Sequence, residues 1–544
     1  MSGAAGATGA AGAAGAAAAP AKRDDSQWRP KGNPWLIAVC VTVAAFMEVL
    51  DTTIVNVSLP HIAGSLSSSY DDATWALTSY LVANGIVLTI SGWLSDVFGR
   101  KRYFMICIGM FTVCSLLCGL SQSLPQLILF RLAQGFFGGG LQPNQQSIIL
   151  DTFDASKRGQ ALSVVAIATV VAPILGPTLG GYITDNISWR WVFFINVPIG
   201  LAGLFGVAAL VEDPPWVAER RSHGVDYIGI ALITLGLGSL QVALDRGQDE
   251  DWLGSGFIRV MFLFAFLGIT GAIGWLLTTS RPVVNIRVMQ NRNFALGAMM
   301  IGCMSFVLYS SAVLMPQFAQ QVIGYTATQA GLILSPGGFV IIMLIPIITR
   351  ILPRVPTRSL ITIGFTMLGC SLLYSSRLVP DIMFHQLALM RVTQTCGLAF
   401  LFVPISTIAY STMPRELNGD AAAMYTMFRN VIGSVGISTS TALIQQRIQV
   451  RQAHMSDWMT PLNQPFNDFL HTTQTTLLSL GHAPATVQGT ALGIAYQQFL
   501  KQVSVQAYTD VFRLTAVAAF CIVPLTFLFS NYKPGAGARV QAGH

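Results

Sequence analysis

Runs of about 20 apolar residues recur along this chain from Trp35 almost to its last residues, and this repetition restricts the fold more than any other feature. Each run is long enough to cross the hydrocarbon core of a bilayer, which is about 30 Å thick. Of the 544 residues, 53% are hydrophobic and only 10% are charged, whereas a soluble globular protein carries about 25% charged residues. The sequence therefore predicts an all-α polytopic membrane protein.

The spacing of the apolar runs predicts fourteen transmembrane spans. Their expected ranges are 35–57, 73–94, 103–121, 125–149, 159–183, 190–211, 226–245, 256–277, 294–318, 328–349, 359–376, 382–409, 420–445 and 509–530. With the N-terminus inside, about two thirds of the 31 Lys and Arg residues lie in the tails and in the loops of the same side. This asymmetry predicts that both termini are cytoplasmic, and the scattered net charge of +7 gives no stripe for binding nucleic acid.

The remaining composition excludes several kinds of site. All eight cysteines fall inside expected spans, and none forms a metal-binding pair in a loop, so neither a disulfide framework nor a zinc site is indicated. The first apolar run is a full span that follows several cations, which argues against a cleavable signal peptide. Residues 1–34, which open with almost pure Ala and Gly, are expected to form a disordered cytoplasmic tail. No nucleophile elbow, phosphate loop or metal cluster indicates an enzyme.

Two parts of the chain repeat each other at an offset of 260 residues. An in-span Arg-x-x-Gln occurs at Arg131 and Gln134 and again at Arg391 and Gln394. Three small residues repeat at the same offset: Gly159, Ala161 and Gly176 match Gly419, Ala421 and Gly436. Duplicated six-helix halves with a substrate site at their interface near midplane are typical of transporters. The seventh and eighth spans then join the halves as an insertion.

The stretch G-W-L-S-D-V-F-G-R-K-R from Gly92 to Arg102 forms the turn between the second and third spans. Its three cations anchor the turn on the inside of the membrane. Asp96 is placed to accept hydrogen bonds from nearby helix N-termini or to pair with Arg100, and such contacts stabilise by about 0.3–1 kcal/mol, as suits a gate that must open. The expected gate residues are Gly92, Asp96, Gly99, Arg100, Lys101 and Arg102.

Several motifs together resemble those of the major facilitator superfamily, and of its fourteen-span drug–proton antiporters of the EmrB/QacA type, over residues 35 to 530. They are the turn just described, L-D-T-T-I-V-N-V-S-L-P from Leu50, R-L-A-Q-G-F-F-G-G-G from Arg131, A-P-I-L-G-P-T-L-G-G from Ala172, W-R-W-V-F-F-I-N-V-P from Trp189 and L-D-R-G-Q from Leu244. The loop R-I-L-P-R-V-P-T-R from Arg350 departs from the pattern, because it keeps the cations but lacks the Gly and Asp of the turn.

The resemblance implies a major facilitator fold in the bacterial cytoplasmic (inner) membrane, with two six-helix bundles and two linker helices. The expected parts are an N-terminal bundle (35–211), the inserted helices (212–293), a C-terminal bundle (294–531) and a cytoplasmic tail (532–544). The resemblance further implies proton-coupled export of hydrophobic or amphipathic small molecules by alternating access, without a cofactor. An uptake symporter on the same fold and a non-transporting sensor or scaffold are the alternative functions.

Two acidic side chains, Glu48 and Asp51, lie well inside a span, three residues apart and therefore on one helix face. Burial disfavours the charged form of a carboxylate, so such a group takes up and releases protons readily. Arg131 is expected at nearly the same depth as Asp51, counting 1.5 Å per residue from the span ends. We predict that protonation of Asp51 weakens its pairing with Arg131; the alternative is a static ion pair that locks helix packing.

The fifth span and the C-terminal half add two further groups of candidate residues. Pro173, Gly176, Pro177 and Gly180 predict a kinked, side-chain-poor surface, either a pivot for antiport or a site of close helix packing. Arg391 and Arg429 have no in-span carboxylate in their own half, and with Gln134 and Gln394 they are assigned to a substrate cavity that favours neutral or weakly acidic amphiphiles. Pairing of the two arginines with backbone carbonyls is the competing interpretation.

The last outer loop, 446–508, is far longer than the others and rich in Gln, Thr and Ser, with a short helix expected around Val487–Val505. An ordinary surface loop is one interpretation of this segment. By resemblance to relatives that work in tripartite pumps, the alternative is a docking surface for a periplasmic adaptor (membrane fusion) protein that connects to an outer-membrane channel.

Overall fold

The computed structural model describes residues 30–154, 157–214, 225–280 and 282–529. Most of the predicted tail 1–34 and all of the predicted tail 532–544 lie outside these residues. Throughout the described part of the chain the structure is helical, without β-strands. Each of the fourteen predicted spans coincides with one helix or with two helices joined end to end, so the all-α fold is confirmed. Eleven helices are long and apolar enough to cross a membrane by length and composition alone.

The first bundle is built from the helices up to residue 210, in which α1 packs against α6 and α8, and α4 packs against α2 and α3. Its elements are α1 (Pro34–Ser65), α2 (Tyr70–Phe98), α3 (Arg100–Leu120), α4 (Leu124–Gly138) with α5 (Leu141–Thr152), α6 (Arg158–Asn186), and α7 (Trp191–Phe194) with α8 (Asn196–Leu210). The predicted fourth span is broken between α4 and α5. Gly139 and Gly140 form the turn between them, and a side chain at Gly139 would meet the backbone of α2, so a larger residue has no room there.

The second bundle is built from the helices after residue 290, in which α12 packs against α16, and α15 packs against α13 and α14. Its elements are α12 (Arg292–Phe318) with the π-helical turn η4 (Ala319–Ile323), α13 (Ala327–Ile351), α14 (Thr357–Ser375), α15 (Phe384–Ala409), η5 (Arg415–Leu417), α16 (Asn418–Ser456), α17 (Gln464–Ser479), and α18 (Pro484–Ile522) with η6 (Val523–Leu528). The two bundles meet where α6 packs against α13 and where α2 and α5 pack against α16.

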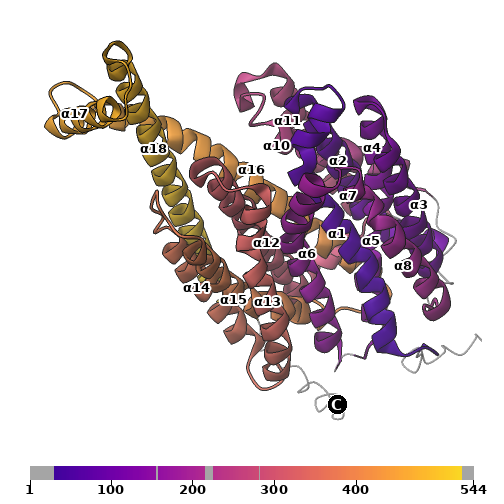
Figure 1. Cartoon of the computed structure of the whole chain (residues 1–544). Helices are drawn as coiled ribbons and strands as arrows, with labels where there is room; N and C mark the ends of the chain where they lie inside the picture. Colours follow the sequence, from indigo (N-terminus) through magenta and orange to yellow (C-terminus); the bar gives the residue numbers. More distant parts are fainter. Residues whose placement is uncertain (1–29, 155–156, 215–224, 281, 530–544) are drawn as a thin grey trace, which may run out of the picture.

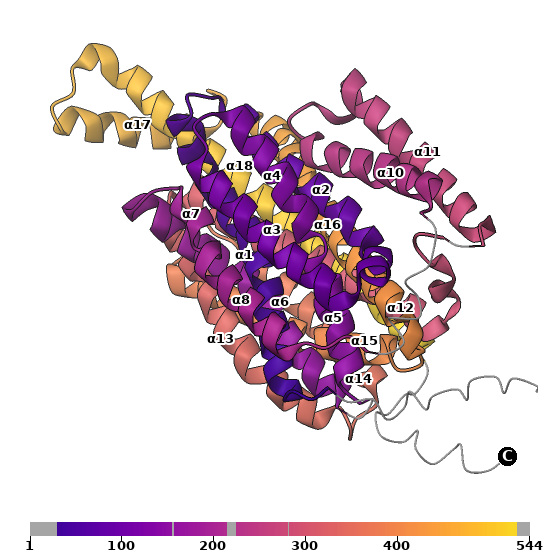
Figure 2. The ribbon, with the colours of Figure 1, turned by 90° about the vertical axis from the view of Figure 1, so that its right-hand side faces the viewer.

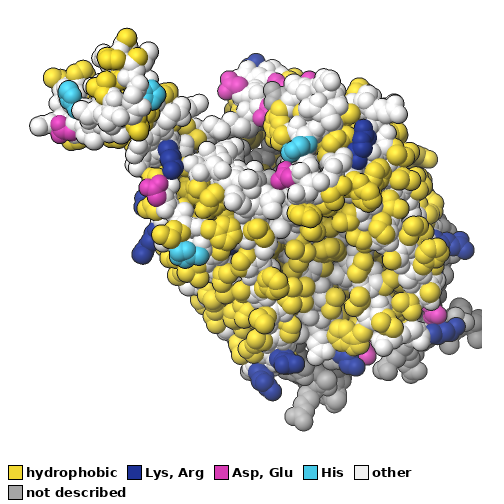
Figure 3. Space-filling model, in the orientation of Figure 1, with side chains coloured by type: hydrophobic (Ala, Val, Ile, Leu, Met, Phe, Trp, Pro, Cys, Tyr) yellow, Lys and Arg dark blue, Asp and Glu magenta, His cyan; other side chains and the backbone are white. Residues whose placement is uncertain are grey.

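Two inserted helices connect the bundles. They are α10 (Tyr227–Arg246) and α11 (Gly256–Thr278), followed by the short turn η3 (Ile286–Gln290), with η2 (Trp252–Gly254) between them. The two helices pack against each other, and α10 also packs against α2 and α16, at the outside of the molecule (Figure 2). Figure 3 shows hydrophobic side chains over the middle of one face of the protein, with Lys and Arg at its lower edge, as expected for a surface that faces lipid.

The segment predicted as a loop at 446–508 is almost entirely helical, which corrects that prediction. Helix α16 continues to Ser456, α17 follows, and α18 runs unbroken from Pro484 through the predicted helix at 487–505 into the last span. Together these segments form a helical hairpin that projects beyond the rest of the molecule (Figure 1). The polar composition hid the helix because Gln, Thr and Ser at these positions face water rather than lipid.

Candidate functional site

The centre of the first bundle holds a buried ion pair between Asp51 of α1 and Arg131 of α4. The distance from Arg131 Nη1 to Asp51 Oδ2 is 2.6 Å, and both side chains are 0% exposed. Arg131 Nε donates to the carbonyl of Ala76 at 3.2 Å, and its guanidinium lies 4.0 Å from the centre of the Tyr80 ring. The positive charge therefore has a carboxylate, a carbonyl and an aromatic face as partners, which together offset its removal from water.

The second oxygen of Asp51 is held by two amides. Its Oδ1 accepts from Gln134 at 3.1 Å and from Asn196 of α8 at 2.7 Å. Gln134 in turn accepts from Arg131 at 2.8 Å, and the Asn196 amide also lies 3.0 Å from the hydroxyl of Ser115 on α3. Helices α4 and α8 thus contact this carboxylate of α1 directly, and α3 is linked to it through Asn196. A proton on Asp51 would therefore disturb contacts to α4 and α8 together.

Glu48 forms a separate polar cluster one turn away on α1. It accepts hydrogen bonds from Tyr80 at 3.3 Å, from Asn84 at 3.0 Å, and from Gln142 of α5. Its side chain is buried, and Arg429 of α16 is close enough to interact with it electrostatically. Arg429 therefore interacts electrostatically with a carboxylate of the opposite bundle, which the sequence did not predict. Glu48 thus lies at the interface between the bundles, whereas Asp51 lies within one of them.

Arg391 and Gln394 repeat part of this arrangement in the second bundle. Arg391 Nη1 donates to the hydroxyl of Ser311 at 3.0 Å and to Gln394 at 3.3 Å. Gln394 donates to the hydroxyl of Ser375 at 2.8 Å, and the arginine is 0% exposed. Among the described residues, the hydrogen-bond partners of this guanidinium are the neutral side chains of Ser311 and Gln394, rather than the backbone carbonyls that the competing interpretation requires.

The α2–α3 turn lies far from these clusters and connects both bundles. Gly99 has φ 86°, a conformation that favours glycine, and it allows α3 to begin at once after α2. Arg100 forms a buried ion pair with Asp151 at the end of α5, and Asp151 also accepts from Asn418 at the start of α16 at 2.8 Å.

The other residues of the predicted gate occupy three different settings. Lys101 donates from its backbone to Asp213 and from its Nζ to the Ala208 carbonyl, both at 2.7 Å. Arg102 is exposed, and Asp96 is half-buried at the end of α2. A side chain at Gly92 would lie 3.2 Å from the carbonyl of Gly419, so α2 and α16 are in close contact here. The turn therefore packs against α8 and α16 and leaves one of its three cations in solvent.

The prolines and glycines of the fifth span lie where α6 crosses α1. Pro173 and Pro177 are inside α6, which stays helical through both residues. A Cβ at Gly176 would collide with the side chain of Thr53, and one at Gly180 would lie 2.9 Å from the carbonyl of Ile54. The small residues thus allow backbone contact between the two helices. On the other side of α6, the hydroxyl of Thr178 meets that of Ser335 on α13 at 3.3 Å.

Gly180→Ala is expected to lower the stability of the protein by about 1–3 kcal/mol, because the added methyl group has no room beside α1. The matched control is Gly85→Ala in α2, where an added Cβ meets nothing within 4 Å. Alanine favours a helix over glycine by about 1 kcal/mol, so the control variant should be as stable as the parent or more so. Thermal unfolding of both variants in one detergent measures the difference. Equal midpoints for the two variants would contradict this account of the crossing.

Sequence reasoning missed the uncharged members of these clusters and the contacts of α10. Thr78 donates to Asp245 near the end of α10, and Arg246 donates to Thr74 at 2.5 Å. Ser438 of α16 donates to the carbonyl of Leu244 at 2.7 Å, so α10 contacts both bundles. Two motifs in the sequence could have indicated these residues. The L-D-R-G-Q stretch contains the residues of α10 that make the contacts, and the Asn of W-R-W-V-F-F-I-N-V-P is Asn196. Within the described residues, no group of His, Cys, Asp and Glu could hold a metal ion.

Comparison with known proteins agrees with this fold. The family model of the Major Facilitator Superfamily matches residues 41–437. The multidrug export protein EmrB of Escherichia coli K12 is 35% identical over 510 residues, covering 94% of this chain and 98% of the relative. The fatty acid resistance protein FarB of Neisseria gonorrhoeae is 31% identical, covering 90% and 95%. A crystal structure of an auto-inhibited peptide transporter of the POT family has a TM-score of 0.55 at 14% identity, covering 92% and 98%, which supports the fold alone.

Proposed function

Because the chain belongs to the major facilitator superfamily, and is therefore a multi-pass membrane transporter rather than an enzyme, we propose that it exports hydrophobic or amphipathic small molecules in exchange for protons. The names of its relatives, multidrug export protein EmrB and fatty acid resistance protein FarB, support export. The ion pair between Asp51 and Arg131 is the single observation that carries the coupling to protons. No cofactor is required, since the proton gradient supplies the driving force.

The coupling step is the arrival of a proton on Asp51. Protonation removes the negative charge that faces Arg131 at 2.6 Å, while Gln134 and the Ala76 carbonyl still hold the guanidinium. The attraction between α1 and α4 weakens, and the equilibrium between inward-facing and outward-facing arrangements of the two bundles shifts. Release of the proton restores the pair. Glu48, which contacts α2 and α5 and interacts with Arg429 of the other bundle, is a second proton site that responds to the same movement.

The gate at the α2–α3 turn is assigned to the cytoplasmic side of a bacterial inner membrane. The concentration of cations at this end supports that orientation, with both termini cytoplasmic. Asp151 bridges Arg100 of the first bundle and Asn418 of the second, so opening the cytoplasmic side breaks these contacts. Helix α6, which touches α1 and α13 through small residues, is the pivot of the movement.

We assign the substrate path to the interface between the bundles, where Arg429 is a candidate contact. Gln134, Arg391 and Gln394 are each buried in a cluster within one bundle, and we propose that they contact the substrate when the bundles rearrange. Arginine without a carboxylate in its own bundle favours neutral or weakly acidic amphiphiles over dications. The fatty acid resistance named for the relative FarB supports this preference.

Counterflow in inverted membrane vesicles tests the proposal. An imposed proton gradient, acidic inside, should drive a lipophilic weak acid into the vesicles against its own gradient, and collapse of the gradient should release it. Accumulation of a neutral amphiphile and of a lipophilic dication, measured in the same vesicles, shows which class of substrate is preferred. Efflux driven by the same gradient would indicate an uptake symporter. No response to the gradient with any of the compounds would indicate a sensor or scaffold.

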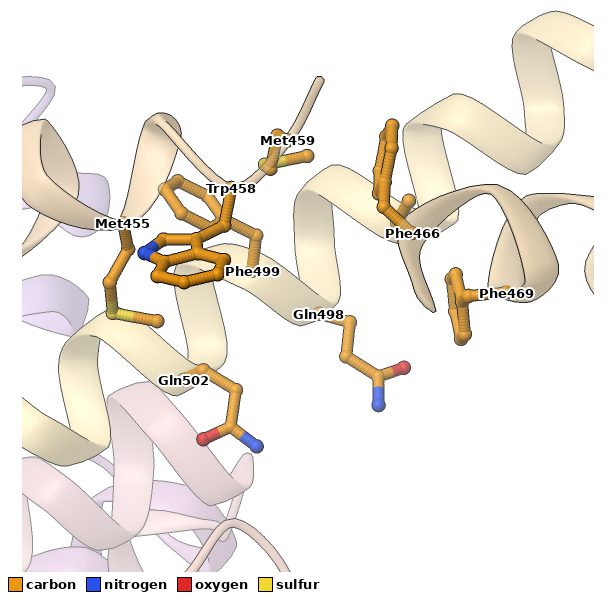
Figure 4. A pocket seen from close by; sticks show the side chains of 9 residues that line it. Met455, Trp458, Met459, Phe466, Phe469, Gln498, Phe499 and Gln502 are labelled. Atoms are coloured by element: carbon orange, nitrogen blue, oxygen red, sulfur yellow. The ribbon is translucent and has the colours of Figure 1, made fainter. Parts of the chain in front are cut away.

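The projecting hairpin is proposed to bind an amphipathic helical segment of a periplasmic adaptor protein, which in turn connects to an outer-membrane channel. Trp458 is 70% exposed and Leu462 is 96% exposed, in the segment between α16 and α17. Trp458 also lines an apolar cavity of about 270 Å³, together with Met455, Met459, Phe466, Phe469 and Phe499 (Figure 4). The hairpin extends away from the bundles and the lipid-facing belt, so a soluble partner reaches it without entering the membrane (Figure 1).

A photo-reactive residue at position 462 is expected to cross-link in cells to a membrane-fusion protein. The same residue at Leu253, an equally apolar position that is 67% exposed on the turn between α10 and α11, serves as the control and should not capture it. Mass spectrometry of the cross-linked product identifies the partner. Cross-links from position 462 to lipid or to a second copy of this chain alone would refute adaptor binding.

A further inference from the structure

The polar cluster of the first bundle has a counterpart in the second bundle, 260 residues later in the sequence. Adding 260 to Ser115, Arg131 and Gln134 gives Ser375, Arg391 and Gln394. The hydrogen bond from the arginine to the glutamine is present in both clusters, at 2.8 Å and 3.3 Å. The two serines accept hydrogen bonds at equivalent places, from Asn196 in one bundle and from Gln394 in the other. The duplication therefore extends from the sequence to individual side-chain contacts.

One position of the cluster differs in charge between the two bundles. The position equivalent to Asp51 is Ser311, whose hydroxyl lies 3.0 Å from Arg391 Nη1 just as the carboxylate lies 2.6 Å from Arg131 Nη1. Serine keeps the place of the acceptor but supplies no negative charge. Among the residues that the structure describes, no acidic side chain forms an ion pair or hydrogen bond with Arg391. The second bundle thus holds a buried cation at the place where the first bundle holds a neutral pair.

The other partners of the first arginine are also missing from the second. Arg391 Nε and Nη2 are both buried without a hydrogen-bond partner, whereas Arg131 Nε donates to the Ala76 carbonyl. The aromatic ring of Tyr80 under Arg131 corresponds to Val340, which has no aromatic face. A guanidinium that is 0% exposed with two free nitrogen atoms is strongly unfavourable unless an anion joins it. The two free atoms, Nε and Nη2, lie on one edge of the guanidinium, as bidentate recognition of a carboxylate requires.

We propose that Arg391, together with Ser311 and Gln394, is a binding site for a monovalent anion, which takes the place of the carboxylate that Asp51 supplies in the first bundle. The anion is either a halide from solution or the carboxylate of an amphipathic molecule, because both offer one negative charge of small size to the guanidinium edge. Arg391 is fully buried in this arrangement of the helices, so the anion reaches it when the second bundle rearranges. Anion binding does not depend on the proposed direction of transport.

Thermal unfolding of the purified full-length protein in detergent tests the site, starting from a HEPES–sulfate buffer that contains neither halide nor carboxylate. Chloride and octanoate are titrated separately, with octanol as the control for the apolar chain. A ligand that binds only the folded protein raises the midpoint with a dependence set by its dissociation constant. A rise with chloride identifies the ion as the occupant. A rise with octanoate but not with chloride or octanol identifies the carboxylate of an amphiphile.

Ser311→Asp decides whether Arg391 is the site. The new carboxylate recreates the ion pair of the first bundle, so the variant should unfold at a higher temperature than the parent when no anion is present. It should also bind the effective anion at least about tenfold more weakly, which corresponds to about 1.4 kcal/mol. Ser311→Ala, which removes one hydroxyl of the site but adds no charge, should weaken the response without abolishing it. Arg391→Gln should abolish it. No rise of the wild-type midpoint with either anion, or an unchanged response in Ser311→Asp, would overturn the proposal.

Discussion

Asp51→Asn is expected to abolish proton-driven transport while the protein still folds and inserts. Asparagine keeps the shape of the side chain and an acceptor oxygen for Asn196, but it cannot gain or lose a proton under physiological conditions. The bias that protons impose on the two arrangements of the bundles is then lost. The accumulation ratio should therefore fall to its value without a proton gradient, which is the loss of a coupling free energy of about 1–3 kcal/mol, or about 5- to 150-fold.

The remaining partners of Arg131 support the expectation that this variant folds. With asparagine at position 51, Arg131 still has the Ala76 carbonyl, Gln134 and the face of the Tyr80 ring. Accumulation in inverted vesicles measures transport, and size-exclusion chromatography with thermal unfolding measures folding. Asp381→Asn is the control, since the side chain of Asp381 is 95% exposed and far from the cluster. Gradient-driven accumulation at the parent level in Asp51→Asn would remove this residue from the coupling step.

Proton-independent exchange separates coupling from substrate binding. If Asp51 acts only in coupling, the variant should still exchange labelled for unlabelled substrate across vesicles without a gradient. Loss of exchange as well as accumulation would indicate that Asp51 also contacts the substrate or is needed for the bundles to move.

The helical architecture was predictable because a bilayer fixes both the length and the polarity of a span. Apolar runs therefore located α6, α11 and α13 closely. The same property explains the error at the hairpin. Hydropathy measures which residues face lipid, and α17 and the first half of α18 face water, so their helices carried no such signal.

The candidate site was predictable only where charge marks it. Asp51 and Arg131 stood out because ionisable residues are costly inside a membrane, and helix geometry placed them at one depth. Asn196 and Gln142 are neutral, and polar amides occur in many helices without a role, so neither could be assigned to the cluster from sequence alone. The proximity of Glu48 to Arg429 was equally hidden, since it depends on how the two bundles meet.

The two bundles differ in charge at one equivalent position, which suggests that they respond to different ions. One duplicated cluster retains a carboxylate that can carry a proton, and the other has serine at the same position. Under our proposals, the half with the carboxylate responds to protons and the other half responds to anions. Exchange of protons for weak acids would need both responses, and the two related clusters would supply one each.

Arg131→Gln is expected to destabilise the protein by about 3–5 kcal/mol, because removing one partner leaves Asp51 as an unpaired buried charge. The double variant Asp51→Asn, Arg131→Gln removes both charges and leaves amides that hydrogen-bond with Gln134 and Asn196, so most of the lost stability should return. Thermal unfolding of the two single variants, the double variant and the parent in one detergent gives the complete double-mutant cycle. Transport should stay absent in the double variant even though its stability is restored, which distinguishes coupling from packing. A double variant that regained gradient-driven accumulation would show that the pair serves only to hold the helices together.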